Sequence, residues 1–512
     1  MTRVVWGYIL EGSMYKKMGW MVVCLLVATA LYAQIAATVS GTVVDNSGAV
    51  VPDATISLQL AGTTTSVYTT KSSSVGTYTL PSVNPGIYDL IAEGKGFQRV
   101  VVKDVRVAPG RITDVPEIKL AIAAINAEVE VTALNDILQL STAEVSTTIT
   151  SRQIQELPVL DRSPLSFVAT QAGVTMKPGG NTTINGQRTS YANVTIDGIN
   201  IQDNFIRTND LDFLPNLLLL DQVAEVTIST SNGGSAASGG SGQIAFSTPS
   251  GTNNYHGRAY WSNRNSALAA NTWFNNQSGT KLPFLNQNQV GGTIGGKIIK
   301  DKAFFYTNYE LFRLHQQTSN NRTVLTPDAR NGIFTYRDAA GTVQKVNLLQ
   351  AAGVQQDSLM QTVLGKVPTT INNYLVGDSS AALLRNTAGY NFVRRNNEVR
   401  DNVTIKGDYL PSTRHSFTVT YLWNRDILDR PDQDPTFNVV PLVTNNDTTK
   451  GLSSAWRYNP TTNFTNEVRY GFNWAPAIFL DSQQIPQYFV TGTVYTNPIA
   501  GILRTQGRNT DT

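Results

Sequence analysis

The stretch Ile184-Asn-Gly-Gln-Arg-Thr-Ser-Tyr-Ala-Asn-Val-Thr-Ile-Asp-Gly198 decides how this chain folds. Within it, the run from Asn193 to Asp197 is rich in β-branched residues and predicts a strand. The pair Asp197-Gly198 predicts the tight turn that ends this strand. The stretch therefore indicates an ordered domain, and the segments on either side of it indicate the class of that domain.

Two helices are expected before this stretch. Residues 151–158 predict a helix that begins with Ser151 as its cap and ends at the proline. Residues 160–174 form a second amphipathic pattern, with Asp161 or Ser163 as its cap. Helices and strands are thus mixed along this part of the chain, which predicts an α+β domain.

The stretch 184–198 resembles the plug domain of TonB-dependent outer-membrane receptors, and most of all the Oar-like subgroup with an N-terminal carboxypeptidase-regulatory-like domain. The later run from Ser231 to Gly257 resembles the end of such a plug and its passage into the first barrel strand. The resemblance covers nearly all of the chain after about Ile35 and implies a plug at residues 134–250. It also implies a plug motif that holds plug to barrel rather than touching substrate, made of Asn185, Gly186, Gln187, Arg188, Asp197 and Gly198.

The N-terminus has the pattern of a secretory signal peptide at residues 1–33. Lys16 and Lys17 supply the positive charge, an apolar run follows, and Ala33 is a small residue suited to cleavage before Gln34. The apolar run is shorter than the ~20 residues of a membrane-spanning helix. The only cysteine, Cys24, lies in this segment, so the mature chain is expected to contain no thiol.

Residues 36–120 predict a small β-sandwich, because short alternating strands are separated by turn residues. Val39–Val44 alternates, and the turn Asn84-Pro85-Gly86 joins two later strands. The amino-acid sequence of this segment resembles that of the carboxypeptidase-regulatory-like family, which has a transthyretin-type or starch-binding-like sandwich fold. The segment contains no histidine, so it cannot build a His-Glu-His zinc site and is not expected to be a peptidase.

The segment Ala127-Glu-Val-Glu-Val-Thr-Ala133 resembles a TonB box. An extended peptide of this kind can add as a strand to the edge of a partner's sheet. The same residues also fit the last strand of the sandwich or a plain linker, and both alternatives stay open. On the first reading, TonB would contact Glu128, Val129, Glu130, Val131 and Thr132.

From residue 255 to residue 512 the pattern is that of an antiparallel transmembrane β-barrel. In the run 462–474, apolar and aromatic residues share one parity and polar residues hold the other, as expected for strands between lipid and a wet lumen. Short turns at 300–302, 410–414 and 459–461 alternate with long polar connections. A soluble sandwich is the alternative, but its strands would be shorter, roughly five to six residues.

Only about seven to nine strands fit in this region, well below the ~22 of a plugged outer-membrane transporter. The chain also ends at Thr512 without the closing strand and terminal aromatic residue of such barrels. We therefore expect a C-terminally truncated fragment with part of a barrel. The fold class is mainly β: an N-terminal transthyretin/starch-binding-like β-sandwich, an α+β plug domain and part of an antiparallel transmembrane β-barrel.

Other chemistry finds little support in the sequence. The formal net charge of +3 gives no basic patch for nucleic acid, the three histidines are scattered, and the glycine-rich run 233–242 lacks the Gly-Lys-Ser/Thr of a phosphate loop. The residues Asp426, Asp429, Asp432 and Asp434 could bind calcium, but prolines interrupt the loop and the pattern of an EF-hand is missing, which favours a solvated surface loop. We expect no catalytic residue, no metal and no cofactor.

The predicted function is uptake of a specific substrate across the bacterial outer membrane, without catalysis. The resemblance implies that TonB, with ExbB and ExbD, supplies the energy, and that outer-membrane lipid surrounds the barrel. Two alternatives remain: a surface adhesion or carbohydrate-binding protein built on the sandwich, and a passive pore. The starch-binding-like module favours an oligosaccharide or peptide over an iron chelate as substrate.

Overall fold

The computed structural model describes most of the chain from residue 37 onward. The described residues are 37–122, 128–132, 143–157, 162–175, 182–188, 191–202, 218–231, 242–277, 279–378, 384–434, 436–461 and 464–481, with four short strands after them. Of residues 128–132 and 477–481 only the backbone is described. The predicted signal peptide at 1–33 and the glycine-rich run 233–241 lie outside the described residues.

The first domain is a two-layered β-sandwich. One sheet has the order β4-β1-β7, with β8 also paired to β1, and the other has the order β3-β2-β5-β6-β9. The strands are β1 (Ala37–Asp45), β2 (Thr55–Leu60), β3 (Ser66–Lys71), β4 (Thr77–Val83), β5 (Gly86–Glu93), β6 (Arg99–Val107), β7 (Ile112–Asp114), β8 (Ile118–Leu120) and β9 (Glu128–Thr132).

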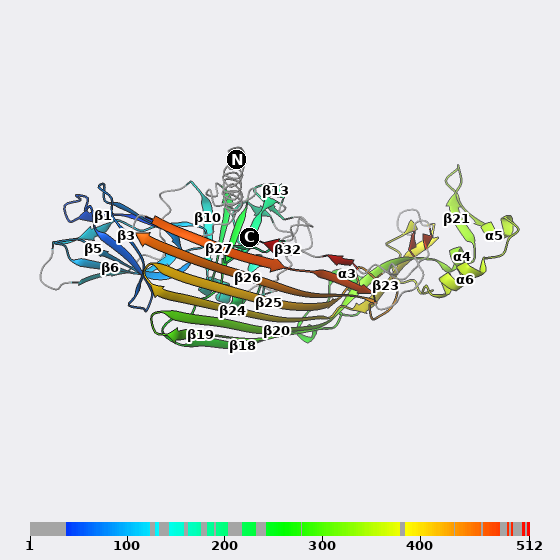
Figure 1. Cartoon of the computed structure of the whole chain (residues 1–512). Helices are drawn as coiled ribbons and strands as arrows, with labels where there is room; N and C mark the ends of the chain where they lie inside the picture. Colours follow the sequence, from blue (N-terminus) through cyan, green and yellow to red (C-terminus); the bar gives the residue numbers. More distant parts are fainter. Residues whose placement is uncertain are drawn as a thin grey trace, which may run out of the picture.

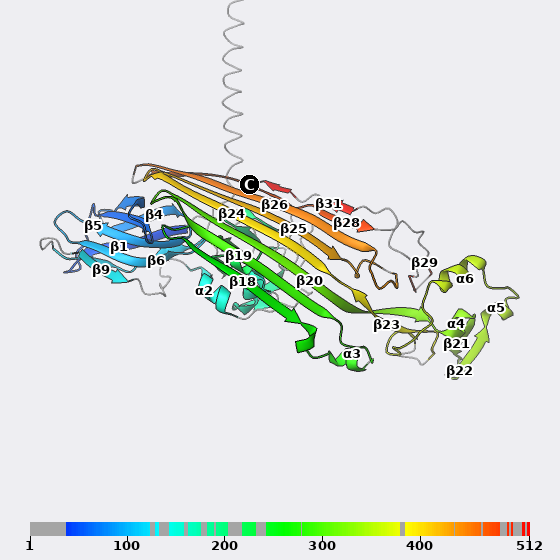
Figure 2. The ribbon, with the colours of Figure 1, turned by 90° about the horizontal axis from the view of Figure 1, so that it is seen from below.

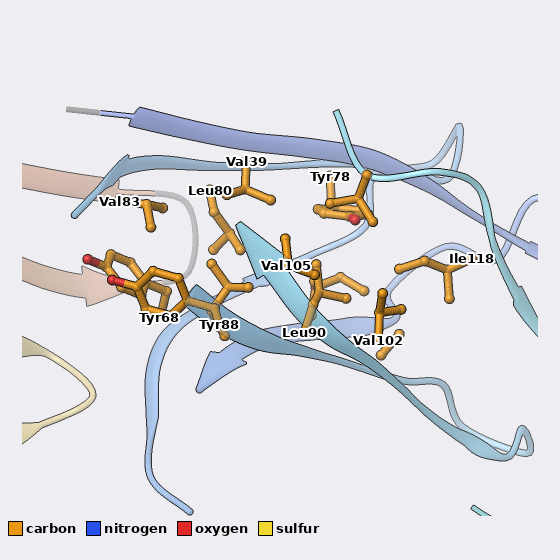
Figure 3. Close-up of a cluster of buried hydrophobic side chains, with 14 of the residues drawn as sticks. Val39, Tyr68, Tyr78, Leu80, Val83, Tyr88, Leu90, Val102, Val105 and Ile118 are labelled. Carbon is orange, nitrogen blue, oxygen red and sulfur yellow. The ribbon is translucent and has the colours of Figure 1, made fainter. Parts of the chain in front are cut away.

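Alternating residues of both sheets form the core of the sandwich. Tyr78 and Leu80 of β4 point inward toward Leu90 of β5 and Val105 of β6 (Figure 3), and all four are buried. The hydroxyl of Tyr78 has no hydrogen-bond partner, and burial raises the pKa of this phenol. The period of two along each strand is thus sufficient to explain the packing of the two layers.

The second domain mixes one five-stranded sheet, of order β10-β16-β17-β14-β15, with short helices and a small sheet of order β11-β12-β13. Its elements are β10 (Val145–Thr150), α2 (Ser151–Glu156), η1 (Pro164–Thr170), β11 (Val174–Thr175), β12 (Thr183–Ile184), β13 (Gln187–Arg188), β14 (Asn193–Ile196), β15 (Ile199–Asn200), η3 (Leu220–Gln222), β16 (Glu225–Ser231) and β17 (Gln243–Ser247).

Two details of the predicted helices are wrong. The cap of α2 is Thr150 rather than Ser151, because Thr150 and Gln153 form a reciprocal capping box. The second helix covers only Pro164–Thr170 and is a 3-10 helix, capped by Ser163. Pro164 at its first position starts the helix, and its seven residues suffice to bury Leu165 and Phe167.

The third region is one large antiparallel sheet of eleven strands. Its long members are β18 (His256–Asn265), β19 (Leu285–Ile299), β20 (Ala303–Leu325), β24 (Glu398–Ser412), β25 (His415–Asp429), β26 (Val443–Thr461) and β27 (Phe464–Trp474). Shorter strands are β23 (Thr387–Arg395), β28 (Ala477–Asp481), β31 (Arg504–Gln506) and β32 (Asn509–Asp511). The three predicted hairpins form, but only the turn at 300–302 lies where it was expected. Residues 410–412 belong to β24 and residues 459–461 belong to β26, so these two predicted turns are wrong in position, because the strands continue further than the sequence pattern indicates.

The predicted two-faced pattern is present in β27. Val468 and Tyr470 are more than half exposed on the outer face, whereas Glu467, Arg469 and Asn473 point to the other face, which carries the second domain. Figure 1 shows that domain, with β10 and β13, on one side of the curved sheet. The polar face of the sheet is therefore the face that it turns toward a protein domain.

The two ends of the sheet differ. The β-sandwich lies at the end with the short turns, and a small unit lies at the opposite end, where the connections are long (Figure 1). This unit contains α4 (Pro327–Arg330), β21 (Ile333–Arg337), β22 (Val343–Asn347), α5 (Leu348–Ala351) and α6 (Ser358–Gly365). In the part of the chain that the structure describes, no helix has the length and the apolar character needed to cross a membrane.

The observed architecture confirms the predicted fold class: a mainly β chain with an N-terminal sandwich, an α+β domain and part of an antiparallel barrel. Among the described residues the barrel sheet runs from β18 to β32 without closing on itself.

Candidate functional site

A row of five residues crosses the inner face of the sheet at one height. The strand registers place Tyr306 opposite Lys406, Lys406 opposite Thr420, Thr420 opposite Ser453, and Ser453 opposite Gly471. Because neighbouring strands in register bring such residues side by side, the five form a continuous band, which we call the inner-face row. Each member of the row meets the α+β domain.

The α+β domain meets this row through a two-residue turn. Asp197 and Gly198 join β14 to β15 and have φ angles of 44° and 87°. Positive φ at both central residues defines the type I′ turn, which favours Asp-Gly because glycine adopts this conformation freely and aspartate tolerates it. The sequence therefore builds a narrow hairpin tip that can reach the wall of the barrel.

The side chain of Asp197 collects donors from both domains. Its Oδ1 accepts from the backbone N–H of Thr248 at 3.0 Å, and its Oδ2 accepts a short hydrogen bond from the Thr248 hydroxyl. The Thr420 hydroxyl donates to Oδ2 at 2.8 Å, and Lys406 Nζ lies 4.0 Å from Oδ1. Lys406 also donates to the carbonyl of Thr248 at 2.9 Å.

The backbone carbonyl of Asp197 is held by two further barrel strands. Ser453 Oγ of β26 donates to it at 2.7 Å, and Arg469 Nη1 of β27 donates at 2.6 Å. Arg469 is itself fixed by Glu467, at 2.8 Å. Four consecutive strands, β24 to β27, thus converge on one turn, and two of the contacts bring a positive charge.

Glycines allow the close approach at this point. A Cβ added to Gly198 would lie 2.2 Å from Arg469 Nη1, and a Cβ on Gly471 would lie 2.7 Å from the carbonyl of Leu452 and 2.9 Å from Ile199 of β15. A larger residue at either place would push the hairpin tip away from the wall.

A second anchor joins the domain to β18 and β20. Arg162 and Arg258 pair with the carboxylate of Asp221 at 3.4 Å and 3.1 Å, and the Tyr306 hydroxyl donates to the Asp221 carbonyl at 2.6 Å. Burial raises the pKa of Asp221 above its ordinary value, although the two guanidinium groups act in the opposite direction. Buried charges that are paired and hydrogen-bonded in this way fix one geometry.

The neighbouring rows toward the short turns contact the sandwich instead. Arg457 of β26 is only 3% exposed; its guanidinium lies 3.8 Å from the ring centroid of Tyr68 and donates to the carbonyl of Ser82. Asn84 Nδ2 donates to Thr418 Oγ1 at 3.1 Å. The sandwich is therefore docked on the barrel wall by specific polar contacts.

A cavity of about 640 Å³ lies where the three parts meet. The sandwich contributes Tyr68 and Tyr88 to its lining, the α+β domain contributes Glu225 and Phe246, and the barrel contributes residues such as Phe304. Arg106 of the sandwich pairs with Glu225 at 3.3 Å. Burial raises the pKa of Glu225 to about 7, against the opposing effect of Arg106.

The outer face of the sheet carries aromatic rings near the short turns. Phe417 and Trp456 are parallel, with centroids 6.2 Å apart, and His415 stacks on Tyr458 at 4.7 Å. A band of aromatic side chains at the end of an apolar outer face is typical of barrels at a membrane boundary.

The comparison with protein families agrees with this geometry. Residues 247–510, more than half of the chain, match the family described as outer membrane beta barrel domain. The chain belongs to this family. Residues 38–121 of this outer-membrane barrel protein match the carboxypeptidase regulatory-like domain, in agreement with the expected sandwich.

Solved structures similar to this barrel protein have low sequence identity. One is the outer membrane transporter YddB from Escherichia coli, at 14% identity and a TM-score of 0.44, with 72% of this chain and 44% of that chain covered. Another is a mutant of the ferric enterobactin receptor PfeA from Pseudomonas aeruginosa, at 11% identity and a TM-score of 0.40, with 73% and 46% covered. The siderophore receptor PirA from Acinetobacter baumannii shows 12% identity and a TM-score of 0.34, with 68% and 50% covered.

The barrel protein thus spans about half the length, or less, of these three structures. None of the curated protein sequences compared with it matches.

The structure gives the TonB-box candidate a definite backbone arrangement. Residues Glu128–Thr132 form β9, which pairs in parallel with β6, from Arg99 opposite Glu128 to Lys103 opposite Thr132. β9 is the last strand of its sheet, the alternative placement expected from the sequence. An edge strand still has one side on which a further strand can pair. Ala127 and Ala133 lie outside the described residues.

The six residues of the expected plug motif fall in two places. Asp197 and Gly198 lie at the barrel wall, as described above. Asn185 and Gly186 form a second turn with positive φ, between β12 and β13, and Asn185 Nδ2 donates to the Thr230 carbonyl at 2.6 Å. The contacts of this second turn are within the α+β domain, and Gln187 and Arg188 are exposed on β13.

Three of the four aspartates of the proposed calcium loop pair with arginines, whereas Asp426 lies in β25 opposite Arg400 and Asp447 and has a buried Oδ1 without a hydrogen-bond partner. Asp434 is fully buried and pairs with the equally buried Arg394 at 2.5 Å, Asp429 pairs with Arg395 at 2.7 Å, and Asp432 pairs with Arg430. Within the described ranges, no three histidine, cysteine or acidic residues are arranged to hold a metal ion. The carboxylates of Asp429, Asp432 and Asp434 order the loop through arginines.

Sequence reasoning missed the barrel side of the site. No sequence motif includes the four residues concerned, which are Lys406, Thr420, Ser453 and Arg469. One signal was available: each stands on the polar face of a two-faced strand, which narrows the choice to the inner face but does not single out these four residues.

Proposed function

We propose that this chain is part of a TonB-dependent outer-membrane receptor, which takes up a specific substrate with energy from the TonB, ExbB and ExbD complex. The α+β domain is the plug, the sheet is the barrel wall, and the short-turn end faces the periplasm. The receptor itself performs no catalysis. The observation that carries the proposal is the convergence of β24 to β27 on the Asp197-Gly198 turn of the plug.

This anchoring supports energised uptake over a passive pore. A pore needs an open lumen, whereas here a folded domain is held against the inner wall by charged hydrogen bonds at Asp197 and by paired charges at Asp221. Such contacts are individually strong but few, so an external force can break them together. A plug of this kind fits a transporter that opens only when work is done on it.

The position of β9 supports the contact with TonB. It is an edge strand that precedes the plug in the chain, and its backbone can take a further strand on its outer side. We infer that Glu128 to Thr132 form this contact. The alternative of an adhesion protein built on the sandwich needs neither an edge strand before the plug nor an anchored plug.

The test is binding of the purified periplasmic domain of TonB to receptor in isolated outer membranes, measured by co-sedimentation. Val131→Pro removes a backbone donor and fixes φ, so binding should weaken by about tenfold or more. Val131→Thr is the matched control, because it keeps the N–H and a β-branched side chain, and it should bind as the wild type does. Equal binding by the proline variant would mean that β9 is not the TonB box.

A further inference from the structure

The sandwich occupies a position that the uptake function leaves unexplained. It sits over the short-turn end of the barrel wall, beside the plug (Figure 2). A substrate that passes the plug on its way to the periplasm must leave through this end. The contacts of the sandwich therefore bear directly on the exit path.

Besides the hydrogen bond between Asn84 and Thr418 described above, three contacts hold the sandwich there. The first is Arg457, buried between the Tyr68 ring, the Ser82 carbonyl and the Ser416 hydroxyl. The second is the turn at Asp301, whose carboxylate accepts from the N–H and the hydroxyl of Thr64, both at 3.3 Å.

Asn253 completes this second contact, because its Nδ2 donates to Asp301 at 2.6 Å and to the Gly62 carbonyl at 3.1 Å. The third contact is the pair of Arg106 with Glu225, which joins the sandwich to the plug. The three contacts are spread over the barrel wall, a short turn and the plug, so together they fix the orientation of the sandwich.

The interface is closed but not tightly filled. The cavity of about 640 Å³ lies within it, and two carboxylates of its lining each keep a buried oxygen without a hydrogen-bond partner: Oε2 of Glu225 and Oδ2 of Asp408. A buried carboxylate oxygen of this kind takes water as its partner, and a cavity of this size has room for it. The sandwich is thus held by a few polar contacts around a cavity, which separates more easily than a continuously packed interface.

The sandwich also carries β9. Because β9 pairs in parallel with β6 along five residue pairs, a force applied to β9 acts on the sandwich through that pairing. β6 also holds Arg106, the residue that contacts the plug.

We propose that the sandwich is a second gate, on the periplasmic side of the plug, which TonB lifts from the barrel mouth when it pulls on β9. This rests on the proposed function, since it needs TonB to act at β9. It adds the sandwich as a moving part. Two contacts hold this gate shut, Arg457 with Tyr68 and Asp301 with Thr64, and we call them the latch.

The experiment measures exposure of Thr418, which lies under the sandwich and contacts Asn84. Thr418→Cys is the reporter and is labelled with a 5 kDa polyethylene glycol maleimide added to cells with permeabilised outer membranes. Ser74→Cys, on an exposed turn of the sandwich, is the control for reagent access. Within these 512 residues Cys24 is the only cysteine, and it lies in the predicted signal peptide, so receptor without an engineered cysteine gives the background labelling.

Labelling at position 418 should be about tenfold faster in cells with TonB and a proton gradient than in cells without TonB, whereas position 74 should label equally in both. In the second variant, Arg457→Ala together with Thr418→Cys, labelling should be fast even without TonB, because the latch is lost.

Equal, slow labelling with and without TonB would overturn the gate, provided that TonB still binds the receptor; the uptake function would then stand. Fast labelling of Thr418→Cys in all cells would also overturn it, since the sandwich would not be docked. Absence of TonB binding would instead refute the proposed function, and co-sedimentation reports this separately.

Discussion

Removal of the Asp197 side chain should release the plug from the barrel wall. The informative substitution is Asp197→Gly, because glycine adopts the positive φ of 44° at this position without strain, so that only the carboxylate is lost. The loss leaves the Thr248 N–H, the Thr420 hydroxyl and the ammonium of Lys406 without their acceptor. Lys406 keeps one bond, to the Thr248 carbonyl.

The cost can be estimated from these contacts. Removing one partner of a buried ion pair costs about 3–5 kcal/mol, and the remaining bond of Lys406 places this case at the lower end, about 3 kcal/mol. Since about 1.4 kcal/mol corresponds to tenfold, opening of the plug should become about 100-fold more frequent. Asp197→Asn keeps an acceptor and the turn but loses the charge, so its effect should be smaller.

The assay is native-state hydrogen exchange of the amides in β14 and β17, measured on receptor in outer membranes by mass spectrometry. Glu156→Ala is the control, because Glu156 forms only an exposed pair with Arg152 on the surface of α2. Exchange in Asp197→Gly within twofold of the wild type would refute the reasoning, as would an equal effect of Glu156→Ala.

Three further predictions concern other parts of the chain. The pKa of Glu225 is about 7 in the folded chain against an ordinary 4.5, so the folded state holds the proton more tightly and stability should fall as the pH rises from 4.5 to 7. A rise of this size corresponds to about 3 kcal/mol of pH-dependent stability. Thermal unfolding of Glu225→Gln across pH 5–8 should lack this slope, and an unchanged slope would contradict the assignment. Gly198→Ala should speed hydrogen exchange in β14 as Asp197→Gly does, because the added Cβ would collide with the Arg469 side chain. Exchange at the wild-type rate would show that Arg469 moves aside without releasing the plug. N-terminal sequencing of the exported protein should begin near Gln34; a retained Met1 or Met14 would refute the predicted cleavage.

The sequence was sufficient for those parts of the fold that depend on local patterns. The parity of residues 464–474 predicted which face of β27 is apolar, because a strand has a strict period of two. The pair Asp197-Gly198 predicted its turn, because only a few residues adopt positive φ. Ser163 was one of two expected caps and is the observed one.

Other features depend on register and could not be derived from one sequence. The inner-face row exists because the register of β24 with β25 and that of β25 with β26 bring Lys406, Thr420 and Ser453 to one height. The burial of Arg457 under Tyr68 depends on how two domains meet, about which neither local sequence is informative. The pairing of β9 with β6 was expected only as an alternative, since a five-residue alternating strand fits either an edge or a free peptide.

The most direct test of the account is a disulfide crosslink between β9 and TonB in living cells. Single cysteines at residues 128 to 132 of the receptor are combined with single cysteines in the periplasmic domain of TonB, and crosslinked pairs are detected by immunoblot. The account predicts crosslinks at these five positions. It predicts none at Ser74→Cys, which lies on an exposed turn of the sandwich and far from residues 128–132 in the sequence. Crosslinking that is absent throughout residues 128–132, while TonB crosslinks normally to another receptor in the same cells, would contradict energised uptake through this strand.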